Sequence, residues 1–172
     1  MAFQSTVFIN QGAGIQGDKY SDSPWRAQSF TLRSSNEADN IIGAAMYTKT
    51  SEGIAEAGSG GVNGFAGLLV NSKVYANAGT VSGGTLDASV VLKNETQAEL
   101  ATMGQFWVIL PAAAAIGDLV VYDNFTGALS TIAPAAALPA GTSFGFAKVD
   151  VREVTAPGLA IIEMSPTFVI PV

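Results

Sequence analysis

Short apolar runs alternate with clusters of Gly, Asn, Asp, Pro and Ser along most of this 172-residue chain. Apolar residues recur nowhere at a sustained helical spacing, whereas short runs rich in Val, Ile, Thr and aromatic residues, bounded by turn-forming residues, are typical of β-strands. The pattern predicts strands at Thr6–Ile9, Ile41–Thr48, Gly67–Asn71, Leu86–Lys93, Phe106–Leu110, Leu119–Tyr122, Leu129–Ile132, Ser143–Val151, Leu159–Met164 and Thr167–Ile170.

The clearest alternation of apolar and charged residues is Val149–Arg152, where the valines are expected to face inward and the charged side chains to face solvent. Such alternation is typical of an antiparallel sheet with one solvated face. Helical character is confined to Asn94–Met103, which is long enough for at most one short helix. The predicted fold class is therefore all-β, an antiparallel β-barrel or sandwich with an extended N-terminal arm and at most one short helix.

Residues 1–40 differ from the rest because their Gly-rich and polar runs enclose little that can form a core. We expect an extended N-terminal arm with loops over residues 1–40 and a single β domain over residues 41–172. The head of the arm carries the apolar residues Phe3, Val7, Phe8 and Ile9. Exposed apolar side chains on an arm indicate a partner surface, while an edge strand of the protein's own sheet explains them equally well.

The chain contains neither histidine nor cysteine, and it has only 8 Lys and Arg with 14 Asp and Glu. Most routes to catalysis and to soft-metal binding need one of the two missing side chains, so we expect no enzyme activity, no cofactor and no metal site. The net charge of −6, with scattered basic residues, argues against nucleic acid as a partner. The composition therefore favours a binding surface over a reactive site.

One uncharged stretch, residues 100–117, approaches the length of a membrane span. Gly104, Gln105 and Pro111 interrupt it, which favours a buried strand followed by a connection, and no membrane partner is expected. The N-terminus shows no basic region followed by an apolar run and a cleavage site. We therefore expect the protein to be made and kept, or assembled, in the cytoplasm.

Two glycine motifs match the residue spacing of nucleotide-binding or catalytic loops but lack the neighbouring helix or the histidine that such loops need. Gly12–Gly17 has the spacing of a dinucleotide-binding loop, but the residues that follow cannot begin a good helix. Gly141–Gly145 has the letters of a serine-hydrolase elbow, yet the chain has no imidazole to activate Ser143. Two carboxylate groupings keep an enzyme or a calcium site open as alternatives: Asp118 with Asp123, and Asp18 with Asp22.

The two tryptophans are expected to differ in role. Trp107 lies inside an apolar run and is expected in the core, whereas Trp25 follows Pro24 in a polar stretch and is the better candidate for an interface anchor. Exposed aromatic side chains also suit a platform for sugars. A carbohydrate-binding module therefore stays open as an alternative.

Several short motifs occur in order along the chain. In the first, Gly17–Arg26, a Gly-Asp pair precedes a Pro and an Arg that Trp25 separates. The others are Gly64–Phe65, Gly104–Val108, Ile116–Tyr122 and Thr126–Ala128. Together they resemble the motifs of the structural cement, or capsid decoration, proteins of tailed bacteriophages, with a glutamine at position 105 where that family has an acid.

This resemblance implies a β-rich, non-enzymatic protein on the outer surface of a phage capsid, synthesised in the host cytoplasm. Its implied partners are the major capsid protein, whose subunits it would bridge to stabilise the head, and further copies of itself, a trimer being favoured. An acidic β domain suits the outside of a head better than its DNA-filled interior. The alternative is a carbohydrate-binding or adhesion module displayed on the virion. The residues expected to contact the capsid are Phe3, Val7, Phe8, Ile9, Trp25 and Arg26.

Overall fold

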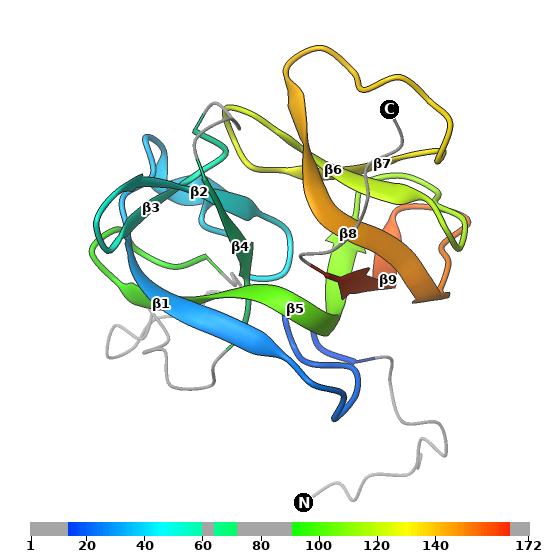
Figure 1. Ribbon diagram of the computed structural model, residues 1–172, viewed down its shortest axis with the longest axis horizontal. Coiled ribbons are helices and arrows are strands. Elements are labelled where there is room, and N and C mark those ends of the chain that lie inside the picture. The colour runs from blue at the N-terminus through cyan, green and yellow to red at the C-terminus, as the bar shows by residue number, and fades with distance from the viewer. Residues whose placement is uncertain (1–13, 60–63, 72–90, 166–172) are drawn as a thin grey trace, which may run out of the picture.

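The computed structural model describes residues 14–59, 64–71 and 91–165 of the chain (Figure 1). Within these ranges the fold is built from β-strands, with a single turn of 3-10 helix, η1, at Glu37–Asp39. The all-β prediction is therefore confirmed. The strands are β1 (Arg26–Leu32), β2 (Met46–Ser51), β3 (Ile54–Ala57), β4 (Phe65–Leu69), β5 (Gln97–Leu110), β6 (Leu119–Asp123), β7 (Leu129–Ile132), β8 (Thr142–Arg152) and β9 (Gly158–Met164).

Five strands close into a small barrel in the order β1-β3-β2-β4-β5, because β5 also pairs with β1. The β1–β3 pair is parallel, and the other pairs are antiparallel. Closure leaves the barrel without an unpaired edge strand, which is the usual way for a small β structure to avoid unwanted pairing. Of the two architectures that the sequence left open, the structure shows the barrel.

The long strand β5 belongs to two sheets. Its first half pairs with β1 and β4 in the barrel, and its second half, from Gly104 to Leu110, pairs with β9. From there a second, open sheet continues in the order β5-β9-β8-β6-β7 (Figure 1). Gly104 lies at the transition with a φ of +122°, a conformation that L side chains rarely adopt. The glycine therefore lets one strand turn from the barrel into the second sheet.

Each part has its own core. Inside the barrel, Phe30, Leu32 and Tyr47 belong to one buried cluster. Val108 and Ile162 belong to a second cluster, which lies mainly beneath the open sheet. Across the described ranges, no helix has the length and apolar character that crossing a membrane requires.

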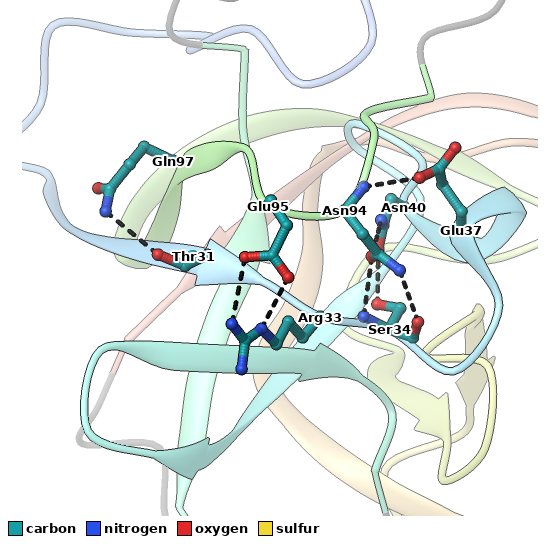
Figure 2. Close-up of polar contacts among 8 residues, drawn as sticks. All are labelled: Thr31, Arg33, Ser34, Glu37, Asn40, Asn94, Glu95 and Gln97. Carbon is teal, nitrogen blue, oxygen red and sulfur yellow. Dashed lines mark hydrogen bonds and ion pairs between the residues drawn. The ribbon is translucent and has the colours of Figure 1, made fainter.

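A polar network closes one end of the barrel (Figure 2). The Asn40 side chain is fully buried; its Oδ1 accepts hydrogen bonds from Ser34 Oγ at 2.6 Å and from Tyr47 Oη at 2.8 Å. Its Nδ2 donates to the Leu92 carbonyl and to Asn94 Oδ1, both at 3.0 Å. Among the described residues, no buried side-chain nitrogen or oxygen is left without a partner. The network therefore satisfies the polar groups that the barrel buries.

Asn94–Met103, where at most one short helix was expected, forms no helix, and most of the segment lies in β5. Ala98 and Leu100 face the barrel core, while Gln97 on the alternate face is exposed. Pairing with β1 on one side and with β4 on the other overrides the helix-forming preference of these residues.

Two strands are absent from the sequence prediction. The structure places Arg26–Leu32, which was expected within the arm and loops, in β1, where only Phe30 and Leu32 are buried. A strand with one wet face and few apolar residues gives little signal. The four-residue β3 is too short to stand out. The predicted strands at 6–9 and 167–170 and most of that at 86–93 lie outside the described residues.

The alternation at Val149–Arg152 holds only in part. Val149 is buried, but Val151 is 46% exposed. The β8–β9 register shifts between Val149 and Arg152, so the inward and outward positions change after Val149.

Candidate functional site

Residues 14–25 approach the second half of β5 on the side away from β9. Gly17 N donates to the Trp107 carbonyl at 2.7 Å, Trp107 N to the Asp18 carbonyl at 2.9 Å, and Tyr20 N to the Gln105 carbonyl at 2.9 Å. These bonds cover the free edge of β5. The segment that leads from the arm into β1 is therefore tied to the second sheet.

Trp107 lies on the outer face of the second sheet, half-buried, instead of in the core where the sequence placed it. Its neighbours Phe106 and Val108 point the other way and are fully buried. Tyr20 packs edge-on against the Trp107 ring at 5.6 Å, and the Arg152 guanidinium lies 5.6 Å from that ring. The sequence did not reveal this alternation of buried and half-buried positions, because both faces of the strand carry large apolar residues.

Trp25 lies in an exposed position just before β1. The side chain is 41% exposed, and Lys19 Nζ lies 5.0 Å from the centre of its ring, which is a cation–π distance. Its Cβ packs so closely on Gly104 that a Cβ added there would be 2.8 Å away. Gly104 and Lys19 therefore both contact this tryptophan.

Two hollows border the segment that carries Trp25. One, of about 310 Å³, is lined by Trp25 with Lys19, Asn71 and Glu99 among other residues. The other, of about 240 Å³, is lined by residues that include Pro24 and Glu163. An exposed indole between concave surfaces is a typical anchor for a protein partner.

Arg26 follows Trp25 in sequence but lines a different hollow. Its Nε lies 3.4 Å from Thr102 Oγ1, and with Phe65 and Phe146 it lines a cavity of about 220 Å³. Trp25 and Arg26 therefore line different hollows. The other predicted contacts, Phe3, Val7, Phe8 and Ile9, lie outside the described residues.

Asp118 and Asp123, one of the two carboxylate groupings considered for catalysis, are not paired. Asp118 and Asp123 lie at opposite ends of β6, about 16 Å apart for five residues of extended strand. Asp118 Oδ2 accepts a hydrogen bond from Ala115 N at 2.9 Å. Bonds from the backbone N of Thr126 and Phe125 and from the Thr126 hydroxyl lower the pKa of Asp123 below its usual value. Each of these two carboxylates holds a turn.

The two glycine motifs also have structural roles. Gly17, at the end of the first motif, is followed by the segment paired with β5 and not by a helix. Ser143, in the second motif, hydrogen-bonds Asn124 Oδ1 at 2.7 Å at the start of β8.

Two further residues were missed by the sequence analysis. Phe125 is 80% exposed in the turn after β6, and Phe146 in β8 has a φ of +50°. A phenylalanine between Asn124 and Thr126 in a turn was a usable signal for exposure. Nothing in the local sequence predicts the backbone conformation of Phe146.

The fold and these surfaces can be compared with known proteins. A family model described as Structural cement protein (E217 gp24/Pam3 gp6) matches residues 3–165. The chain belongs to this family of phage structural proteins. No curated protein matches it.

Two solved structures are similar to this cement protein. A chain in "The capsid of Myoviridae Phage XM1" is 17% identical with a TM-score of 0.58, and the match covers 98% of this chain and 100% of that chain. At this identity the likeness shows a shared fold. A chain in "The crystal structure of head fiber gp8.5 N base in bacteriophage phi29" is 13% identical with a TM-score of 0.41, and the match covers 81% and 95% of the two chains.

The motifs behind the resemblance have definite places in the cement protein. Gly104–Val108 turns β5 from the barrel into the second sheet. Ile116–Tyr122 leads into and forms most of β6. Thr126–Ala128 joins β6 to β7 and contacts the barrel, since Met46 N donates to the Gly127 carbonyl at 2.9 Å. The first and the third occur where the two parts of the fold meet.

Proposed function

We propose that this cement protein binds the outer surface of a phage head, where it bridges subunits of the major capsid protein and stabilises the shell without catalysing a reaction. The observation that carries the proposal is the family match over residues 3–165, almost the whole chain. Synthesis in the host cytoplasm and assembly into a homo-oligomer, a trimer being favoured, belong to the same proposal. The net charge of −6 suits a position outside a DNA-filled shell.

Trp25 is the described residue best suited to contact the capsid. Packing against Gly104 and the ammonium of Lys19 limits the freedom of its indole before binding. Little side-chain entropy would then be lost on binding, and tryptophans in such settings dominate the energy of many interfaces. The apolar residues Phe3, Val7, Phe8 and Ile9 would add buried area along the arm.

Stabilisation of the shell follows from selective binding. A protein that binds the assembled lattice and not free subunits shifts the equilibrium toward the lattice by mass action. Several linked copies would increase the effect, because each bound copy raises the effective concentration of the next.

The test is co-sedimentation with expanded phage heads stripped of their accessory proteins. We expect saturable binding by the full chain, loss of binding when residues 1–13 are removed, and at least about 30-fold weaker binding by Trp25→Ala. Truncation before Gly14 keeps the contacts of Gly17 with β5. The matched control is Ile116→Ala, which removes an exposed apolar side chain elsewhere and should bind normally.

The outcomes separate the parts of the proposal. Equal binding by the truncated and full chains would contradict the role of the arm. Unchanged binding by Trp25→Ala would contradict the role of Trp25. Arg26→Ala is measured separately, because Arg26 lines a different hollow. No binding by any form would contradict the capsid proposal itself.

Carbohydrate binding is a second candidate, supported by the hollow that places Trp25 beside Asn71 and Glu99. Aromatic rings with amide and carboxylate groups are suited to stack on sugars and to hydrogen-bond their hydroxyls. The Lys19 ammonium lies over the indole and would have to move. Glycan-array binding that disappears in Trp25→Ala would support this function, and an array without signal would oppose it.

A further inference from the structure

The hollow beside Arg26, called here the junction hollow, lies where the barrel meets the second sheet. Its lining residues are Arg26, Phe65, Thr102 and Phe146, and its volume is about 220 Å³. Phe65 begins β4 in the barrel, and Phe146 belongs to β8 in the second sheet. Their ring centres are 5.2 Å apart. The junction hollow is thus lined by two aromatic rings and by the cationic Arg26.

Phe146 is held there in an unusual backbone conformation. Its φ of +50° is in the left-handed region, which bulky residues rarely occupy. The β6–β8 register shifts at this point, since Val120 pairs with Ala147 while Val121 pairs with Phe144. A glycine would satisfy such a bulge without strain. Strained residues concentrate at binding surfaces, and here the bulge coincides with a ring that lines the hollow.

Phe125 is an exposed apolar side chain on a hydrogen-bonded turn elsewhere on the same molecule. It is 80% exposed, the highest value among the large apolar residues that the structure describes. The Asp123 carboxylate accepts hydrogen bonds from Phe125 N at 2.9 Å and from Thr126 N at 2.8 Å, which fixes the turn. Gly58 of the barrel packs directly against the backbone of this turn. A turn whose backbone is already fixed loses little backbone entropy when a partner covers it.

The turn and the junction hollow carry opposite charges beside aromatic surface. One offers a protruding aromatic ring with a carboxylate at its base, and the other offers a cavity lined by two aromatic rings and a guanidinium. We propose that Phe125 of one copy inserts into the junction hollow of a second copy of this chain, where Asp123 of the first copy faces Arg26 of the second. This contact rests on the homo-oligomer of the proposed function but not on capsid binding, so a failure of the contact can be told apart from a failure to bind the capsid.

The first test is the mass of the full-length protein in sedimentation velocity over a range of concentrations. We expect a concentration-dependent oligomer for the unchanged chain. Phe125→Ser should weaken association at least about 30-fold, as is usual for loss of a buried aromatic anchor. Thr102→Phe, which fills the hollow from β5, should do the same. Ile116→Ser is the control, because it removes an exposed apolar residue without affecting either surface.

Mixing the two defective variants separates this contact from damage to the fold. Phe125→Ser keeps an intact hollow, and Thr102→Phe keeps an intact Phe125. A mixture should therefore form one-to-one complexes, whereas each variant alone stays monomeric. Circular dichroism melts confirm that both variants are folded. A monomeric unchanged chain, oligomers that neither variant weakens, or a mixture that stays monomeric would each overturn the proposal.

Engineered cysteines give an independent check, because the natural chain has no cysteine. Phe125→Cys mixed with Thr102→Cys should form a mixed disulfide under mild oxidation faster than Ile116→Cys mixed with Thr102→Cys. Equal rates in the two mixtures would contradict insertion of the turn into the hollow.

Discussion

The barrel and the second sheet differ in how their strands are paired and in which residues they bury. Each barrel strand pairs with a neighbour on both sides, and the buried polar residues Ser34 and Asn40 lie at one end of the barrel. The second sheet stays open, and its buried cluster consists of apolar residues and Tyr122. Burial raises the pKa of the Tyr122 hydroxyl and keeps it neutral. Both parts have an apolar core, and the barrel adds a buried polar network to it.

The difference explains where the candidate contacts lie. A closed barrel presents few free backbone groups, so contacts have to come from side chains and loops. The second sheet contributes a covered edge, a strained bulge and a projecting turn. Trp25, Arg26 and Phe146 all lie near the boundary where β5 passes from one part to the other. The boundary, and not either core, carries the surfaces suited to binding.

The largest effect is expected from a cavity in the second sheet. Ile162 in β9 is fully buried, and Ile162→Ala should lower the free energy of unfolding by about 4 kcal/mol. Ile162→Val is the matched control and should cost about 1 kcal/mol. Urea denaturation measures both. Equal costs for the two variants would show that the core of this sheet is loosely packed.

A smaller loss is expected when the polar network of the barrel is broken. Asn40→Ala removes the partner of Ser34, Tyr47 and Asn94 and leaves buried polar groups unsatisfied, at a cost of about 3 kcal/mol. Asn36→Ala, which removes the exposed cap of η1, should cost about 1 kcal/mol. The same urea experiment compares them. If Asn40→Ala costs no more than its control, the network does not stabilise the barrel.

The joint between the two parts can be tested at Gly104. An added methyl would lie 2.8 Å from Trp25 Cβ, and the φ of +122° disfavours any L side chain. Gly104→Ala should therefore cost about 2 kcal/mol and should change the near-ultraviolet circular dichroism of the tryptophans. Gly53→Ala is the control: its φ of +70° is also positive, but it has open space around it. A cost no larger than the control's would show that the backbone alone, and not contact with Trp25, selects glycine.

The sequence predicted the second sheet better than the barrel. Strands β6 and β9 carry continuous apolar runs, and β7 and β8 contain strand-forming residues bounded by turn residues, so the approximate positions of all four follow from pattern alone. In the barrel, β1 exposes most of its residues and β3 spans four, so neither stands out. The first half of β5 even has helix-forming residues, and only pairing with distant strands makes it extended. Strands that long-range contacts define are not visible to local reasoning.

The candidate surfaces show the same limit. Trp25 could be identified because an isolated aromatic in a polar stretch is unusual, and its exposure agrees with that reasoning. The sequence could not show that Trp25 and Arg26 line different hollows. Their positions depend on the pairing of β1 with β5. The junction hollow joins residues far apart in sequence, from 26 to 146. Sequence patterns can identify an anchor, but a pocket between two sheets requires the fold.

The smallest effect is expected at the turn through which the second sheet contacts the barrel. The pKa of Asp123 is lowered because its ionised carboxylate accepts hydrogen bonds within the turn, so the folded state favours the charged form. This contribution to stability is fully present above the unfolded pKa of about 3.9 and is lost as the pH falls through the lower folded value. Asp123→Asn should therefore unfold slightly more easily than the unchanged chain at pH 7, and the gap should narrow below about pH 4. Urea denaturation across this range measures the gap. A stability difference that stays constant with pH would mean that the charge of Asp123 does not stabilise the turn. The hydrogen-bond geometry of the side chain, which asparagine largely preserves, would then be what stabilises it.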